Sequence, residues 1–251
     1  MKILLTNDDG YHAEGLKSLE AALSRDHEVY TVAPLKQMSG SGHSFHLGIP
    51  MELIEVGPRS YAMDGSPADC VKSGLFGIFP GVSFDLVISG INDGPNLGHD
   101  LYYSGTVAGA REGMFNGLFS IALSIDGWDT KKDFKTRSEF IRVFLKDLLE
   151  KSDLETEAYL NINFPAFDIP RGIRVTFPGK RVYKDYIKFE NTNEKRFVLI
   201  DGDFPAYISL PGSDLDCVQD GYISVTPISA DYDNEIMKKK FDYLNRDFYE
   251  A

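Results

Sequence analysis

The sequence is poor in cysteine, in tryptophan and in long apolar runs. It holds two cysteines, Cys70 and Cys217, and one tryptophan among 251 residues. Two cysteines are too few for a disulfide framework and match no zinc-binding spacing, which predicts a reducing compartment, the cytoplasm. The apolar run that opens the chain is too short for the core of a signal peptide or for a membrane-spanning helix. We therefore expect neither export nor a membrane partner.

Positive charge is also scarce. Lys and Arg number 26 against 38 Asp and Glu, which gives a formal net charge of -12, and the one basic cluster is residues 238–240. Such a chain repels a nucleic-acid backbone, so no polymeric nucleic acid is expected as a partner. A small anion is not excluded, because a local pocket of backbone N–H groups or a metal ion can bind one.

Apolar and polar segments alternate along the first two-thirds of the chain. Short, continuous apolar runs are typical of strands buried on both faces of a parallel sheet. The predicted strands comprise residues 2–6, 27–33, 84–89, 119–125 and 159–164. The predicted helices lie between them, at about residues 16–23, 66–79, 107–116 and 140–149. This order predicts an α/β fold with a Rossmann-like, doubly wound and mostly parallel sheet.

The pattern changes from residue 172 onward to short segments rich in Val, Tyr and Phe. Segments 183–190 and 196–200 predict hairpins or an extended arm, and residues 222–227 predict a further strand. A final helical stretch is predicted at 236–244. We expect a single domain over residues 1–251, whose part from about 172 onward is a β-hairpin-rich C-terminal extension.

Polar side chains lie just beyond the predicted strands. Asp8 and Asp9 follow the first strand, Ser39 lies in the long loop 35–48, and Asn92 follows the third strand. Because loops at the carboxyl ends of parallel strands converge, we expect these side chains to meet. Two carboxylates, a hydroxyl and an amide carbonyl form an all-oxygen set that suits Mg²⁺ or Mn²⁺. Taken alone, an Asp-Asp-Gly tripeptide is more commonly a strand-ending turn.

A second candidate feature is the segment 104–106, which leads into the predicted helix 107–116. The start of a helix offers free N–H groups, a positive dipole and hydroxyls to an anion. Thr106 as an ordinary N-cap is an equally good local interpretation. His43 lies in the loop 35–48, and His99 lies in the glycine-rich segment 89–100 that follows the third predicted strand. Each is either a proton donor to a leaving group or a solvated loop histidine.

Five sequence segments match one known family in the same order. They are Ile3–Gly10, Ala33–Gly40, Gly65–Val71, Ser89–Gly98 and Tyr103–Val107. Together they resemble the SurE family, the stationary-phase survival protein phosphatases. The likeness spans most of residues 1–125 and returns at 161–165 and 221–227.

The resemblance implies a metal-dependent phosphomonoesterase of the 5'-nucleotidase type, which acts on nucleoside 5'-monophosphates or other small phosphate esters, with short polyphosphate as a further substrate. It also implies a homodimer or homotetramer that exchanges C-terminal segments, with one Mg²⁺ or Mn²⁺ per subunit. The implied metal ligands are Asp8, Asp9, Ser39 and Asn92. The residues with implied catalytic roles are Asp8, Asp9, Asn96, Ser104 and Thr106. The implied or candidate substrate contacts are Asn96, Ser104, Gly105, Thr106, Ser41 and His43.

Three departures from the family pattern bear on substrate preference: Ser66 replaces the more usual Thr, His99 stands where an acid is common, and Phe177–Lys180 lacks the usual Arg. Two alternative functions stay open. A receiver-like phosphorylation switch also holds Mg²⁺ with an acidic pair, but it predicts an acceptor Asp at the end of the third core strand. A non-catalytic nucleotide-binding protein predicts binding without turnover.

Overall fold

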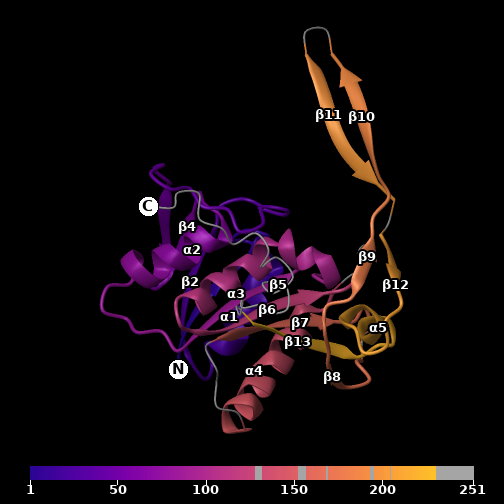
Figure 1. Cartoon of the computed structure of the whole chain (residues 1–251). Helices are drawn as coiled ribbons and strands as arrows, with labels where there is room; N and C mark the ends of the chain where they lie inside the picture. Colours follow the sequence, from indigo (N-terminus) through magenta and orange to yellow (C-terminus); the bar gives the residue numbers. More distant parts are fainter. Residues whose placement is uncertain (128–131, 152–156, 168, 193–194, 204, 230–251) are drawn as a thin grey trace, which may run out of the picture.

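The computed structural model describes residues 1–127, 132–151, 157–167, 169–192, 195–203 and 205–229 (Figure 1). Its central sheet contains β1 (Lys2–Thr6), β2 (Glu28–Pro34), β3 (Leu53–Gly57), β4 (Ser60–Met63), β5 (Leu86–Asn92), β6 (Phe119–Ile125), β7 (Ala158–Phe164), β8 (Ile173–Val175) and β13 (Ile223–Ser229). The strand order is β3-β4-β2-β1-β5-β6-β7-β13-β8. Neighbouring strands are parallel except in the pairs β3–β4 and β7–β13. The predicted α/β fold with a mostly parallel sheet is confirmed.

Helices cover both faces of this sheet (Figure 1). The helices α1 (Glu14–Leu23) and α4 (Phe134–Lys151) pack together, as do α2 (Pro67–Ser73) and α3 (Gly105–Phe115). On β1, Ile3 and Leu5 belong to the core under α1 and α4, whereas Leu4 packs under α2. Successive strand residues point to opposite faces, so a strand covered on both sides must be apolar throughout. Among the described residues, no helix is both long and apolar enough to cross a membrane.

The C-terminal part forms the predicted hairpin arm. Strands β10 (Asp185–Asn191) and β11 (Arg196–Gly202) pair as an antiparallel hairpin, and β9 (Lys180–Val182) pairs with β12 (Ala206–Ile208) at its base. The hairpin projects from the body of the molecule (Figure 1). A short helix, α5 (Asp214–Gln219), follows before β13. The helix predicted at 236–244 lies outside the described residues.

Several element boundaries differ from the sequence prediction. The edge strand β3 was not predicted because its residues are exposed or half-buried and give no buried apolar run. Strand β5 continues through Asn92 instead of ending at residue 89. Helix α3 begins at Gly105 because Ser104 is its N-cap, with its Oγ accepting a hydrogen bond from the Val107 N–H at 3.0 Å. The interpretation of Thr106 as the N-cap was therefore wrong.

Three glycines four residues apart let α3 lie very close to the sheet. A Cβ at Gly109 would lie 2.8 Å from Thr6 Cγ2, and a Cβ at Gly105 would lie 2.9 Å from Asp8 Cβ. Gly113 completes the stripe one turn further along. Contacts this short leave no space for any side chain, so the glycines set the distance between helix and sheet. The N-terminus of α3 consequently lies directly against Asp8.

The loop between β2 and β3, which carries Ser39, is held to the body by a buried acid. Glu112 on α3 is 3% exposed. Its Oε2 lies 2.9 Å from Nε2 of His43 in this loop. Its Oε1 accepts hydrogen bonds from Lys72 at 3.0 Å and from Asn116 at 2.8 Å. Burial opposes ionisation, yet these hydrogen bonds hold the pKa of Glu112 below its usual range.

A second buried acid, Asp69, binds the same loop a few residues further along the chain. Asp69 and Ser66 form the capping box at the start of α2, as the sequence predicts. Asp69 also accepts hydrogen bonds from the backbone N–H of His46 at 3.1 Å, and its Oδ2 lies 2.7 Å from His46 Nδ1. The Ser66 hydroxyl donates to the carbonyl of Ser44 at 2.6 Å. The exposed Ser39 loop is thus fixed at two points downstream of Ser39.

Replacing Gly113 with Ala tests the close packing of α3. Its Cβ would lie 2.4 Å from Ser120 Oγ and 2.7 Å from Val87 Cβ, both on buried strands. Overpacking should outweigh the helix propensity that Ala gains, so urea unfolding is expected to show a net loss of about 1–2 kcal/mol. Gly77→Ala is the control, because no atom lies within 4 Å of its added Cβ. Equal stability of Gly113→Ala and wild type would contradict the packing argument.

Replacing Glu112 with Gln tests the anchor of the Ser39 loop. Because the folded protein lowers the pKa of Glu112, its ionised form stabilises the fold above the unfolded pKa, and this contribution is lost as the pH falls through the folded pKa. Urea unfolding at pH 7 should show a loss of about 1–2 kcal/mol.

The difference between wild type and Glu112→Gln should shrink toward acid pH. Glu55→Gln, at an exposed position on β3, is the control and should change little at either pH. A loss that is the same at pH 7 and at acid pH would show that shape, not charge, matters at this position.

Candidate active site

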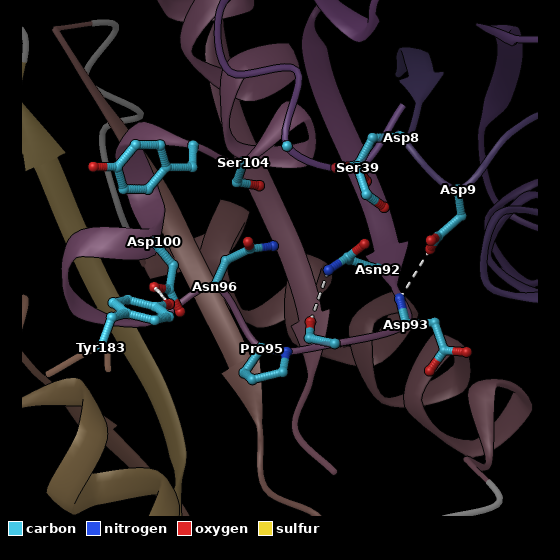
Figure 2. Close-up of a pocket in the computed structure, with 13 residues that line it drawn as sticks. Asp8, Asp9, Ser39, Asn92, Asp93, Pro95, Asn96, Asp100, Ser104 and Tyr183 are labelled. Atoms are coloured by element: carbon cyan, nitrogen blue, oxygen red, sulfur yellow. Dashed lines mark hydrogen bonds between the residues drawn. The ribbon is translucent and has the colours of Figure 1, made fainter. Parts of the chain in front are cut away.

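A cavity of about 210 Å³ lies where β1 and β5 end at the carboxyl edge of the sheet. The four predicted metal ligands, Asp8, Asp9, Ser39 and Asn92, all line it (Figure 2). They come from three segments that are far apart in the sequence. The expected convergence of these strand ends is therefore observed in the structure.

Asp8 and Asp9, called the carboxylate pair below, are poorly solvated. Asp8 is 3% exposed and accepts hydrogen bonds from the Thr106 hydroxyl and from the first backbone N–H groups of α3. Burial raises the pKa of Asp8, and these hydrogen bonds oppose the rise. Burial likewise raises the pKa of Asp9 to about 6, although its Oδ2 accepts a hydrogen bond from the Asp93 N–H at 2.9 Å. Two adjacent acids are thus taken partly out of water.

Two further carboxylates line the cavity, and each has a cationic partner of its own. Asp93 forms an ion pair with Lys132, and Asp100 Oδ2 lies 2.6 Å from Arg181 Nε. Among the described residues that line the cavity, none is Lys, Arg or His. The carboxylate pair is therefore left without a basic side chain in the cavity wall. Ionised carboxylates in this wall would repel a phosphate group, and a bound cation would reduce that repulsion.

The side chains present fit a hard divalent cation. The Asn92 side-chain N–H donates to the Gly94 carbonyl at 2.8 Å, which leaves its Oδ1 available as a ligand. Carboxylate, amide and hydroxyl oxygens are the ligands that Mg²⁺ and Mn²⁺ prefer. Over the described part of the chain, no three or more His, Cys, Asp or Glu side chains are grouped closely enough to form a metal site by themselves. The candidate set has only two such residues, and Ser39 and Asn92 supply the remaining oxygens.

Two of the predicted phosphate-binding residues line the same cavity. The Ser104 Oγ accepts from the Val107 N–H as the helix cap, so its own O–H is available to donate to a ligand. The Asn96 side-chain amide donates one hydrogen to Ser124 Oγ at 2.8 Å, and its backbone N–H donates to Asn163 Oδ1 at 2.8 Å. An amide has two hydrogens, which leaves one for an anion.

The other predicted contacts lie outside the cavity wall. Gly105 and Thr106 lie behind Asp8, and the Thr106 hydroxyl is engaged with that carboxylate. The Ser41 Oγ is buried against Gly105 and has no hydrogen-bond partner among the described residues. His43 does not reach the cavity, because its imidazole is bound to the buried glutamate of α3. His99 is exposed on the 3₁₀ helix η2 (Gly98–Tyr102).

Sequence reasoning missed several residues of the wall. These are Asp93, Pro95, Asp100, Tyr103 and Tyr183. The first four belong to the segments that follow β5, so their place in a glycine-rich loop after a core strand is a usable signal. Tyr183 comes from the C-terminal arm, and nothing in its local sequence points to the site.

Comparisons with known proteins show which family the chain belongs to. The family model described as Survival protein SurE matches residues 3–185. Relatives named 5'-nucleotidase SurE include one from Anaeromyxobacter sp., 39% identical over 92% of this chain and 91% of its own length. Another, from Gemmatimonas aurantiaca, is 40% identical over 92% of this chain and 93% of its own. The crystal structure of the SurE protein from Aquifex aeolicus is similar with a TM-score of 0.84 and 38% identity, covering 97% of this chain and 99% of that one. The chain belongs to the SurE family.

Proposed function

We propose that this chain is a metal-dependent phosphomonoesterase that hydrolyses nucleoside 5'-monophosphates. The observation that carries the proposal is the carboxylate pair, which has no basic side chain beside it in the described cavity wall and whose Asp8 lies directly against the N-terminus of α3. This arrangement suits a cation with a phosphate group beside it. The relatives named 5'-nucleotidase SurE support the same substrate class.

In this proposal Asp8, Asp9, Ser39 and Asn92 hold one Mg²⁺ or Mn²⁺ per subunit. When bound there, such an ion supplies Lewis-acid polarisation of a phosphoryl oxygen and lowers the pKa of water. The donor set contains no thiolate or imidazole, which favours a hard ion over zinc.

The remaining residues bind and orient the phosphate. The Ser104 hydroxyl and the free amide hydrogen of Asn96 donate to phosphoryl oxygens, and the positive end of the α3 dipole stabilises charge that develops on them. Thr106 acts through Asp8, because its hydroxyl fixes the orientation of that carboxylate. We assign no proton-donor role to His43, since its ring is held away from the cavity.

The alternatives make different demands on the same residues. A receiver-like switch needs an acceptor Asp where the third core strand ends, and β5 ends there with Asn92, whose amide cannot form an acylphosphate. A nucleotide-binding protein without catalysis would need no neutralised carboxylate pair beside the phosphate. Turnover of more than one substrate per subunit separates the enzyme from both.

Replacing Asp8 with Asn should lower phosphate release from AMP about 100-fold or more, because the substitution removes one of the two anionic ligands. Chelation of divalent ions from the wild type should abolish release, and added Mn²⁺ or Mg²⁺ should restore it. The assay measures inorganic phosphate from AMP, from other nucleoside monophosphates and from short polyphosphate.

Asp64→Asn, at an exposed carboxylate outside the cavity, is the matched control and should retain full activity. Undiminished phosphate release after both the Asp8 substitution and chelation would refute the metal role. A stable phosphoenzyme without turnover would favour the receiver-like switch.

We also propose that the arm from about residue 172 onward assembles the chain into a homodimer or homotetramer by exchange between subunits. Every residue of β10 and β11 is exposed in the single chain, including apolar Phe189 and Ile200. A two-stranded hairpin alone is at best marginally stable in water. Light scattering at micromolar concentration should therefore give a mass of two or four subunits, and a monomer that keeps full activity would contradict the proposal.

A further inference from the structure

One wall of the cavity is supplied by the C-terminal arm. Tyr183 directly follows β9 at the root of the β10–β11 hairpin, lines the cavity and is 45% exposed. Figure 2 shows Tyr183 beside Asp100, on the side of the cavity away from Asp9. Asn96 and Pro95 lie between Tyr183 and Asp9. The arm therefore contributes to the site itself.

The tyrosine is fixed in place by a buried ion pair. Its hydroxyl donates to Asp100 Oδ1, and Arg181 Nε lies 2.6 Å from Asp100 Oδ2. Arg181 is 9% exposed, so the pair is largely shielded from water. Burial and the hydrogen bond to Asp100 raise the pKa of Tyr183, which keeps the phenol protonated and able to donate.

A second anchor holds the root of the arm at the level of the backbone. Asp214 is fully buried, and its two carboxylate oxygens accept from the Gly179 N–H at 2.7 Å and from the Gly98 N–H at 2.8 Å. The backbone segments at Gly98 and at Gly179 lie so close together that a Cβ at Gly98 would be 2.8 Å from the Gly179 carbonyl oxygen. The ring of Tyr183 is thus preorganised before any substrate arrives.

The chemistry of the wall changes across the cavity. Near the carboxylate pair the groups are polar and suit a cation and a phosphate, whereas Tyr183, Tyr103 and Pro95 supply apolar surface. A planar base is the part of a nucleotide that an aromatic ring binds, by stacking that tolerates every base. With its hydroxyl tied to Asp100, Tyr183 has its ring left for this purpose.

We propose that Tyr183 is a specificity-determining residue whose ring binds the base of the nucleotide and so favours nucleotides over phosphate esters that lack a base. The inference rests on the proposed nucleotidase function and adds to it the residue that recognises the nucleoside. Because stacking tolerates every base, Tyr183 should select for the presence of a base and not for its identity.

Two substrates isolate the contribution of the base. AMP and ribose 5-phosphate share the phosphate and the ribose, and only AMP has a base. Tyr183→Ala should lower kcat/KM for AMP about tenfold, mainly through KM, and should change kcat/KM for ribose 5-phosphate less than about twofold. Tyr183→Phe keeps the ring and should behave like wild type with both. Tyr186→Ala, at an exposed tyrosine of β10 outside the cavity wall, is the control.

Three outcomes would overturn the proposal. Equal losses for AMP and ribose 5-phosphate in Tyr183→Ala would mean that the residue only supports Asp100 and the phosphate end. A loss for AMP in Tyr183→Phe as large as that in Tyr183→Ala would mean that the hydroxyl, not the ring, matters. No loss for either substrate in Tyr183→Ala would also contradict it.

Calorimetric binding separates this inference from the proposed function. In the Asp8→Asn background, AMP should bind about tenfold more tightly than ribose 5-phosphate, and Tyr183→Ala should remove that difference. Wild type without turnover on any phosphate ester would refute the nucleotidase proposal, while the binding comparison would still decide the role of Tyr183.

Discussion

The structure is organised around one unfavourable arrangement, the burial of two adjacent carboxylates at the end of β1. An isolated buried charge costs several kcal/mol, so each oxygen of Asp8 and Asp9 needs a donor or a cation. The hydroxyl of Thr106 and the first amides of α3 serve Asp8, and the amide of Asp93 serves Asp9. These groups do not fully offset the burial, which raises the pKa of both acids, and no basic side chain among the described residues lines the cavity. In the proposed function a cation supplies the missing partner.

Within the described part of the chain, other buried acids have the partners that Asp8 and Asp9 lack. Glu112 and Asp69 are as deeply buried as Asp8, yet each binds a histidine of the Ser39 loop together with further donors, and the pKa of both is lowered. Asp100 has Arg181. Acids with several partners hold loops in place, whereas the carboxylate pair, with no basic side chain in the cavity wall as described, fits the proposed chemistry. The same type of side chain thus takes two roles that depend on what surrounds it.

The sequence predicts those parts of the site whose signal is local. The apolar run of β1 followed by Asp8 and Asp9 gives both a buried strand and its polar end, and parallel topology then brings Asn92 beside them. The cap of α3 was assigned to Thr106 instead of Ser104 because both carry hydroxyls, and only the backbone dihedrals separate the two. Tyr183 could not be predicted, because it reaches the site through anchors at Asp100 and Asp214 that lie far from it in the sequence.

The two ends of the cavity are joined by the segment between β5 and α3. At one end Asn92 and Asn96 line the cavity, and a few residues later Gly98 bonds to Asp214 and Asp100 pairs with Arg181, both at the root of the arm. A rotation of the arm about this root would therefore move Tyr183 relative to Asn96. Under the two proposals, the distance between the phosphate-binding groups and the ring of Tyr183 is set by how the arm docks, so an assembly that uses the arm would also act on the shape of the site.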